Sequence, residues 1–281
     1  MRVVATIKSA FLQVFRPSLI RAGYYDANNF GDQLTIPILQ HLGARAVRSP
    51  SYRFADLSGV GSILHMFPEE FDGWILGSGS IKPDSRRLSK AVPRLLRGPL
   101  SAAVVGAPAD TDYADPGIVA DTVFSIGDVK KTDTVGVVPH YSDYDRVNEL
   151  IGGRPGFRII DVRRPPEDVV REIFSSAAVL SSSLHGLVVA DSLGIPSAWF
   201  LSGNVIGGEF KFRDYFMGVG YDRPHFNLNT SDELDLAASS AFSPDAELLD
   251  AAKRRVLNAY RDYLESRDIV TVNEYHDEVA T

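Results

Sequence analysis

The segment Ser181-Ser182-Ser183-Leu184-His185-Gly186 places three hydroxyl groups beside one imidazole. An apolar, strand-like run over 177–180 precedes it, and a helical run of small apolar residues over 187–193 follows it. The serines and His185 therefore lie where a strand ends and a helix begins, and the free N–H groups of a helix start favour an anion. Because imidazole changes charge near neutral pH, the segment predicts proton transfer beside a bound anion.

Polar motifs follow other predicted strands as well. Asn28-Asn29-Phe30-Gly31-Asp32 follows the strand-like run 19–24, and Gly77-Ser78-Gly79-Ser80 follows 73–76. Each has a purely structural explanation too, since Asp32 is a good helix cap and glycine is common in turns. Neither motif matches the phosphate loop or the dinucleotide-binding fingerprint, so nucleotide binding by those routes is unsupported.

Cationic side chains are needed beside the helix start if the ligand is a multiply charged anion. A helix N-terminus contributes only about 0.3–2 kcal/mol, whereas desolvation costs several kcal/mol per ion. Arg97 follows the predicted strand 93–96, and Lys211 and Arg213 follow the glycine-rich segment 202–208, which resembles a lid. These three side chains are the candidate anion ligands.

The elements that would position these residues alternate along the chain between strand-like and helical runs, which is typical of an α/β protein with parallel sheets. We predict two Rossmann-like units facing a cleft, over residues 1–130 and 131–281. The second unit ends in a long amphipathic helix that begins near Ser243-Pro244.

Composition narrows the classes of protein. The net charge of −7 argues against a general nucleic-acid binder. The absence of cysteine excludes disulfides and thiolate metal sites, and the six scattered histidines suggest no metal site. No apolar run reaches the ~18–20 residues of a membrane span, so we expect a cytoplasmic protein. The basic, acid-free segment 1–25 predicts either a helix packed on the core or peripheral contact with a membrane surface.

Taken together, the motifs resemble the polysaccharide pyruvyl transferase family, and most closely its xanthan-type ketal pyruvate transferase branch. Members transfer pyruvate from phosphoenolpyruvate onto a sugar as a cyclic ketal, without a cofactor, on a fold similar to the two-domain GT-B glycosyltransferases. The resemblance implies an acceptor side in 1–130 and a donor side in 131–281. Its acceptor would be an exopolysaccharide, a cell-wall glycan or a lipid-linked oligosaccharide. The motifs that carry it occur in the family's order: 29–34, 61–65, 74–79, 97–99, 115–117, 138–141, 181–186 and 210–215.

The resemblance also implies roles for individual residues. His185 would be the general acid or base. The wider family commonly has arginine before Leu-His-Gly, whereas this chain has Ser183, as the xanthan-type branch tends to have. The donor would therefore depend on other cations. The implied donor ligands are Arg97, Lys211, Ser181, Ser182, Ser183, Leu184 and Gly186, and the implied acceptor-orienting residues are Asn29, Asp32, His65, Ser78 and His140.

Two other functions fit the same scaffold. One is a GT-B-type glycosyltransferase that uses a nucleotide sugar, and the other is a non-catalytic protein that binds a glycan or a phosphorylated ligand. Release of phosphate from phosphoenolpyruvate only when a glycan acceptor is present distinguishes the pyruvyl transferase from both. The identity of the acceptor depends on hydrogen-bond geometry in loops that the sequence does not define.

Overall fold

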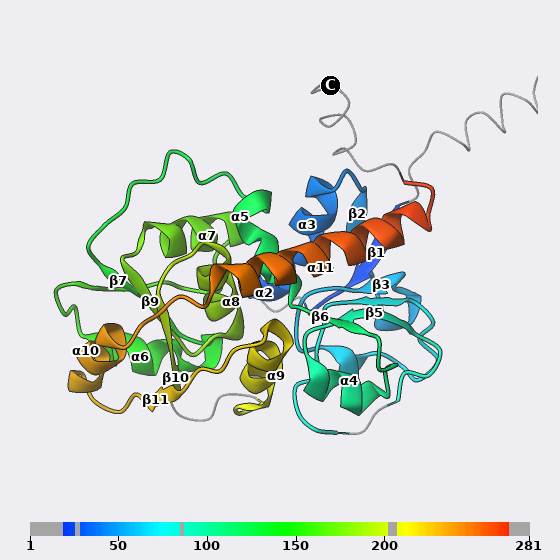
Figure 1. Ribbon diagram of the computed structural model, residues 1–281. Coiled ribbons are helices and arrows are strands. Elements are labelled where there is room, and N and C mark those ends of the chain that lie inside the picture. The colour runs from blue at the N-terminus through cyan, green and yellow to red at the C-terminus, as the bar shows by residue number, and fades with distance from the viewer. Residues whose placement is uncertain (1–18, 26–28, 85–86, 202–206, 270–281) are drawn as a thin grey trace, which may run out of the picture.

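A computed structural model describes residues 19–25, 29–84, 87–201 and 207–269, and it contains two parallel β-sheets (Figure 1). The α/β class with parallel sheets is therefore confirmed. The first sheet has the order β2-β1-β3-β4-β5-β6. Its strands are β1 (Ile20–Gly23), β2 (Ala46–Arg48), β3 (Leu57–Ser58), β4 (Trp74–Leu76), β5 (Val92–Leu96) and β6 (Asp112–Tyr113).

The second sheet has the order β11-β10-β9-β7-β8. In both sheets the second strand lies on one side of the first and the third lies on the other, which is the flavodoxin-like order of doubly wound sheets. The strand order thus reverses between β1 and β3 and again between β7 and β9, and such switch points are where open α/β sheets bind ligands. The strands are β7 (Val135–Val138), β8 (Phe157–Ile159), β9 (Ala178–Ser181), β10 (Ser197–Leu201) and β11 (His225–Asn227).

The helices begin and end where the local sequence predicts in several cases. Pro99 occupies the first turn of α4 (Pro99–Val105), as its fixed φ favours, and the predicted helix over 166–175 is α7 (Pro166–Ser175). The helix predicted from Asp32 to Leu42 is instead two helices, α2 (Phe30–Gln33) and α3 (Thr35–His41), separated at Leu34. The others are α5 (Ala120–Val123), α6 (Tyr144–Ile151), α8 (Leu184–Ser192), α9 (Phe210–Val219), α10 (Asp232–Ser239) and α11 (Ala246–Glu265), with short 3₁₀ turns η1 (Tyr52–Phe54), η2 (Leu64–Met66), η3 (Pro116–Val119) and η4 (Tyr141–Asp143).

The long helix α11 follows the second sheet in sequence but packs along the first, and Figure 1 shows it extending from one part of the molecule to the other. Tyr260 donates a hydrogen bond from its hydroxyl to the carbonyl of Leu76 in β4 (3.2 Å), and Tyr263 makes an edge contact with Trp74. The predicted apolar stripe of this helix is largely buried: Leu249, Ala252, Val256, Tyr260, Tyr263 and Leu264.

One apolar cluster joins the two sheets and α11. It contains Leu76 of the first sheet, Val138 of the second, and Val188 of α8. The boundary near residue 130 stays a prediction. Residues 1–18 of the predicted N-terminal segment 1–25 lie outside the described residues, as do residues 202–206 of the glycine-rich segment 202–208. Among the described helices, none is both long and apolar enough to cross a membrane.

Candidate functional site

A pocket of about 270 Å³ lies at the switch points of both sheets. Its wall comes from the segments that follow β1, β3, β4, β7 and β9 and from the first turn of α9. Strand order thus explains why residues from distant parts of the sequence meet here. Eight of the residues singled out from the sequence line it: Asn29, Asp32, His65, His140, Ser183, Leu184, His185 and Lys211.

The serine-rich turn divides into structural and pocket-facing hydroxyls. Ser181 donates to the carbonyl of Val138 (2.9 Å) and accepts the N–H of Ser183 (3.0 Å), while Ser182 accepts the backbone N–H of His140 (2.9 Å). These bonds join the ends of β7 and β9, and neither serine lines the pocket. Ser183 does line it, as the N-cap of α8 with no side-chain capping bond. The first N–H groups of α8 are therefore available to a ligand.

Gly186 occupies a position where a side chain does not fit. An added Cβ would lie 2.3 Å from Oγ of Ser181 and 2.9 Å from a methyl of Val138. The glycine thus allows α8 to approach the end of β7 closely. Its direct contact with a donor stays a prediction.

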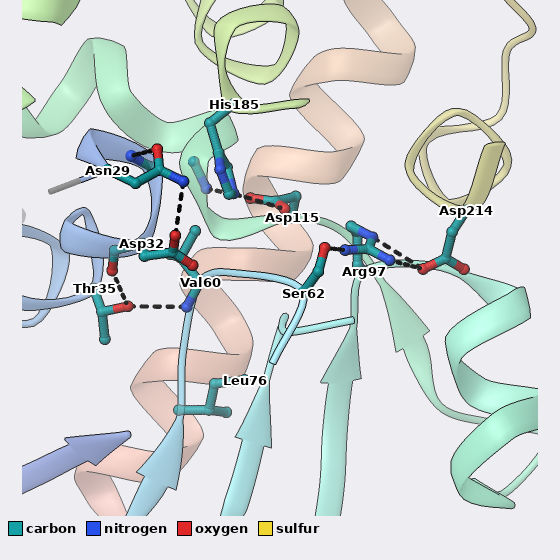
Figure 2. Close-up of polar contacts among 12 residues, drawn as sticks. Asn29, Asp32, Thr35, Val60, Ser62, Leu76, Arg97, Asp115, His185 and Asp214 are labelled. Atoms are coloured by element: carbon teal, nitrogen blue, oxygen red, sulfur yellow. Dashed lines mark hydrogen bonds and ion pairs between the residues drawn. The ribbon is translucent and has the colours of Figure 1, made fainter. Parts of the chain in front are cut away.

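His185 is buried in the first turn of α8 and lies against Gly31. Figure 2 shows its ring beside Asp115. Its Nε2 lies 3.6 Å from Oδ2 of Asp115, and each of these two buried atoms has no hydrogen-bond partner among the described residues. Gly31 is required for the ring to fit, because a Cβ at that position would lie 2.0 Å from Nδ1 of His185. The glycine of the Asn29–Asp32 motif thus leaves space for the ring of His185, which lies in the other half of the chain.

Asp32 lies in the same pocket with its carboxylate buried. Asn29 donates from Nδ2 to Oδ2 of Asp32 (2.9 Å), as Figure 2 shows. Burial raises the pKa of Asp32 to about 6, against the opposing attraction of His185 and Lys211. Gly61 makes room for Oδ1, since its φ is +120° and a Cβ there would lie 2.2 Å from that oxygen. A carboxyl group with this pKa can gain or lose a proton near neutral pH.

His140 is held as a neutral ring. Its Nδ1 accepts the backbone N–H of Ser142 (3.3 Å) and lies 2.7 Å from the Ser142 hydroxyl. Burial, together with the nearby charge of Lys211, lowers the pKa of His140 to about 3. Because Nδ1 is an acceptor, the ring proton lies on Nε2, and His140 can donate a hydrogen bond there.

Lys211 is a buried cation that lines the pocket, with only 5% of its surface exposed. It makes no hydrogen bond or ion pair with any described residue, and its ammonium lies 5.3 Å from the ring centroid of Phe212. Burial, and to a smaller extent the charge of Arg97, lowers the pKa of Lys211 to about 8. An unpaired ammonium in such a place is stabilised by a bound anion.

Arg97 is also buried, but it is bonded to protein groups. Nε of Arg97 donates to Oδ2 of Asp214 (3.0 Å), Nη1 donates to the Ser62 hydroxyl (2.5 Å), and Nη2 donates to the carbonyl of Ser80 (2.7 Å). Figure 2 shows the guanidinium between Ser62 and Asp214. Arg97 does not line the pocket, so its contact with a donor stays a prediction.

The remaining predicted residues lie in different surroundings. Ser78 is fully buried, and its hydroxyl is paired with that of Ser58 (2.5 Å), outside the pocket wall. His65 is exposed at the pocket wall, on the 3₁₀ turn η2. Within the described residues, no group of three or more histidine and acidic side chains could hold a metal ion.

Three residues with evident importance to the site were not assigned roles from the sequence. Tyr25 and Tyr141 line the pocket, and Tyr141 packs against His140 with ring centroids 4.3 Å apart. Asp115 belongs to the Asp-Pro-Gly motif, and no sequence signal indicates that it faces His185, 70 residues later. Asp115 lies two residues after the short strand β6.

Comparisons with known proteins found one matching family model and two curated relatives. Residues 73–204 match a family model described as polysaccharide pyruvyl transferase. The chain is 29% identical over 200 residues to the succinoglycan biosynthesis protein ExoV of Rhizobium meliloti (strain 1021). This alignment covers 68% of this chain and 62% of ExoV. It is also 29% identical over 134 residues to the uncharacterized protein L143 of Acanthamoeba polyphaga mimivirus, which covers 44% and 47%. The chain thus spans less than two thirds of either relative.

Proposed function

We propose that this chain, which matches the polysaccharide pyruvyl transferase family model over residues 73–204 and resembles ExoV over 200 residues, transfers pyruvate from phosphoenolpyruvate to a sugar, as a cyclic ketal with release of phosphate. The acceptor would be an exopolysaccharide, a cell-wall glycan or a lipid-linked precursor. The observation that carries the proposal is the switch-point pocket. It combines the buried cation Lys211, which is unpaired among the described residues, with a helix start that has no side-chain cap and two proton-carrying groups, Asp32 and His185.

The donor would be held by charge and by oriented N–H groups. Phosphoenolpyruvate carries a phosphate and a carboxylate, and both are anions near neutral pH. Lys211 would bind one of them and the first turn of α8, after Ser183, the other. His140 would add a neutral N–H donor from Nε2.

The proton movements balance with two side chains. His185 takes the proton of the first sugar hydroxyl as its oxygen bonds to C2 of the donor, and protonated Asp32 gives a proton to C3, which becomes a methyl group. Phosphate leaves with the proton held by His185. The second hydroxyl then bonds to C2 and returns a proton to Asp32, so both residues end as they began.

Pocket size favours this donor over a nucleotide sugar. The volume of about 270 Å³ is just below the ~300–1,000 Å³ typical of small-molecule sites. A three-carbon phosphate suits such a space, and the acceptor sugar would approach along the partly exposed rings of Tyr25 and Tyr141. If the acceptor is linked to a lipid carrier, the basic residues in 1–25 would bring the enzyme to the cytoplasmic membrane surface.

The test is phosphate release from phosphoenolpyruvate across a panel of glycosides, with each product identified by mass. We expect release only with an acceptor, and a product that carries a ketal-linked pyruvate. His185→Ala should lower turnover by about 10²–10⁴-fold while the fold is retained. Transfer from a nucleotide sugar instead, or donor binding with no turnover on any glycoside, would refute the proposal.

A further inference from the structure

None of the proposed proton transfers uses the buried contact between His185 and Asp115. Nε2 of His185 and Oδ2 of Asp115 lie 3.6 Å apart, and both are buried without another partner among the described residues. Leaving two buried polar atoms unsatisfied side by side costs free energy that a hydrogen bond between them removes. A movement of a few tenths of an ångström closes the gap, and such bonds often tighten only when a substrate binds.

The other oxygen of Asp115 fixes the direction of the carboxylate. Oδ1 accepts the backbone N–H of Gly117 (2.9 Å) and thereby caps the 3₁₀ turn η3. Asp115 is 0% exposed, and η3 packs against α8, which carries His185. One oxygen is thus committed to the backbone, and the second is held facing the imidazole.

A carboxylate accepts hydrogen bonds and cannot donate them, so the imidazole nitrogen that faces it must carry the ring proton. We propose that Asp115 is a positioning residue that holds the His185 proton on Nε2 and leaves Nδ1 as the basic atom of the site. This inference rests on the proposed role of His185 as the base. Nδ1 forms no hydrogen bond with any described residue, and Gly31 beside it has no side chain to cover it.

Asp115→Asn tests this role directly, because the backbone N–H of Gly117 determines the orientation of the asparagine amide. The carbonyl oxygen of asparagine is needed by the N–H of Gly117, so its NH₂ group must take the place of Oδ2. That NH₂ group donates to Nε2, which must then be unprotonated, and the ring proton moves to Nδ1. The variant keeps the shape of the side chain and its hydrogen bond to Gly117, but Nδ1 of His185 no longer has a free lone pair to act as a base.

The position of the proton can be read without any turnover. In protein with ¹⁵N-labelled histidine, long-range proton–nitrogen spectra separate a protonated ring nitrogen from an unprotonated one. His185→Gln identifies the His185 signals among the six histidines. We expect protonated Nε2 in the wild-type protein and protonated Nδ1 in Asp115→Asn.

Turnover supplies the second measurement. Asp115→Asn should lower kcat by about 10²–10⁴-fold, with the KM for phosphoenolpyruvate within about threefold of wild type, because the donor ligands are untouched. Asp143→Asn is the matched control: Asp143 is also buried with one unpaired oxygen, but it lies by Ser142 and Ser182 and should leave the His185 proton in place.

The outcomes separate this inference from the proposed function. A wild-type His185 protonated on Nδ1, or an Asp115→Asn protein with unchanged proton position and kcat, overturns the role of Asp115. A protonated Nε2 that moves in Asp115→Asn, in a protein that transfers no pyruvate, upholds the positioning and overturns the proposed function instead.

Discussion

Two buried cations of this molecule, Arg97 after β5 and Lys211 at the start of α9, differ in what surrounds them. Arg97 is 0% exposed and is bonded to Asp214, Ser62 and the carbonyl of Ser80. Lys211 is 5% exposed and has no hydrogen bond or ion pair among the described residues. The sequence suggests the same role for both, as anion ligands, but only Lys211 lines the pocket.

The contacts of Arg97 explain how it positions Lys211. Asp214 lies one turn after Lys211 on α9, and it accepts from Arg97 and from the backbone N–H of Ser101 in α4 (2.9 Å). These bonds hold α9 against the end of β5 and the start of α4, which places the first turn of α9 at the pocket. Arg97 thus acts within the framework, and Lys211 is left to face a ligand.

The largest expected effect is on stability and falls on Arg97. Arg97→Met leaves the carboxylate of Asp214 buried without its charge partner, so the free energy of unfolding should fall by about 3–5 kcal/mol. Lys211→Met removes a buried charge that has no hydrogen bond or ion pair among the described residues, and it should leave the free energy of unfolding equal or higher. Urea unfolding of the two variants measures both. Equal losses would mean that the two cations do not differ as their contacts indicate.

Sequence patterns predicted which residues meet in the pocket better than they predicted what each one does. Asn29, Asp32, His140 and His185 each follow a strand of a predicted parallel sheet, and the carboxyl ends of such strands share an edge. That rule brings the residues together without any knowledge of the contacts. It also brings Arg97 to the same edge, where it binds to the protein instead.

The contacts that the sequence did not reveal join residues far apart in the chain. Arg97 and Asp214 are 117 residues apart, and nothing local to either indicates the other. The same holds for α11, whose apolar stripe was predicted but whose partner, the first sheet, was not. Periodicity indicates that a face is buried, whereas tertiary packing determines what covers it.

The next effect in size is on catalysis and falls on Lys211. Lys211→Met should lower kcat/KM for phosphoenolpyruvate by about 10²–10³-fold, the usual loss when one group that stabilises developing charge is removed. Arg213→Met is the matched control, because Arg213 lies on the same helix but pairs with Glu209 and Asp222 outside the pocket. Steady-state kinetics with a saturating acceptor measures both. A similar loss in the two variants would show that general charge, and not the pocket ammonium, attracts the donor.

The smallest effect is a change with pH that only one of the two cations can produce. Because burial lowers the pKa of Lys211 to about 8, its ammonium loses its proton as the pH rises through that value, and the donor then loses its cation. Above about pH 8, kcat/KM should therefore fall about tenfold per pH unit, which corresponds to 1.4 kcal/mol for each unit. Arginine stays protonated throughout this range, so Lys211→Arg should keep part of the activity and lose this decline. A profile measured from about pH 7 to about pH 10 tests the prediction. If the decline persists unchanged in Lys211→Arg, the titrating group is another residue, and the free ammonium of Lys211 is not what binds the donor.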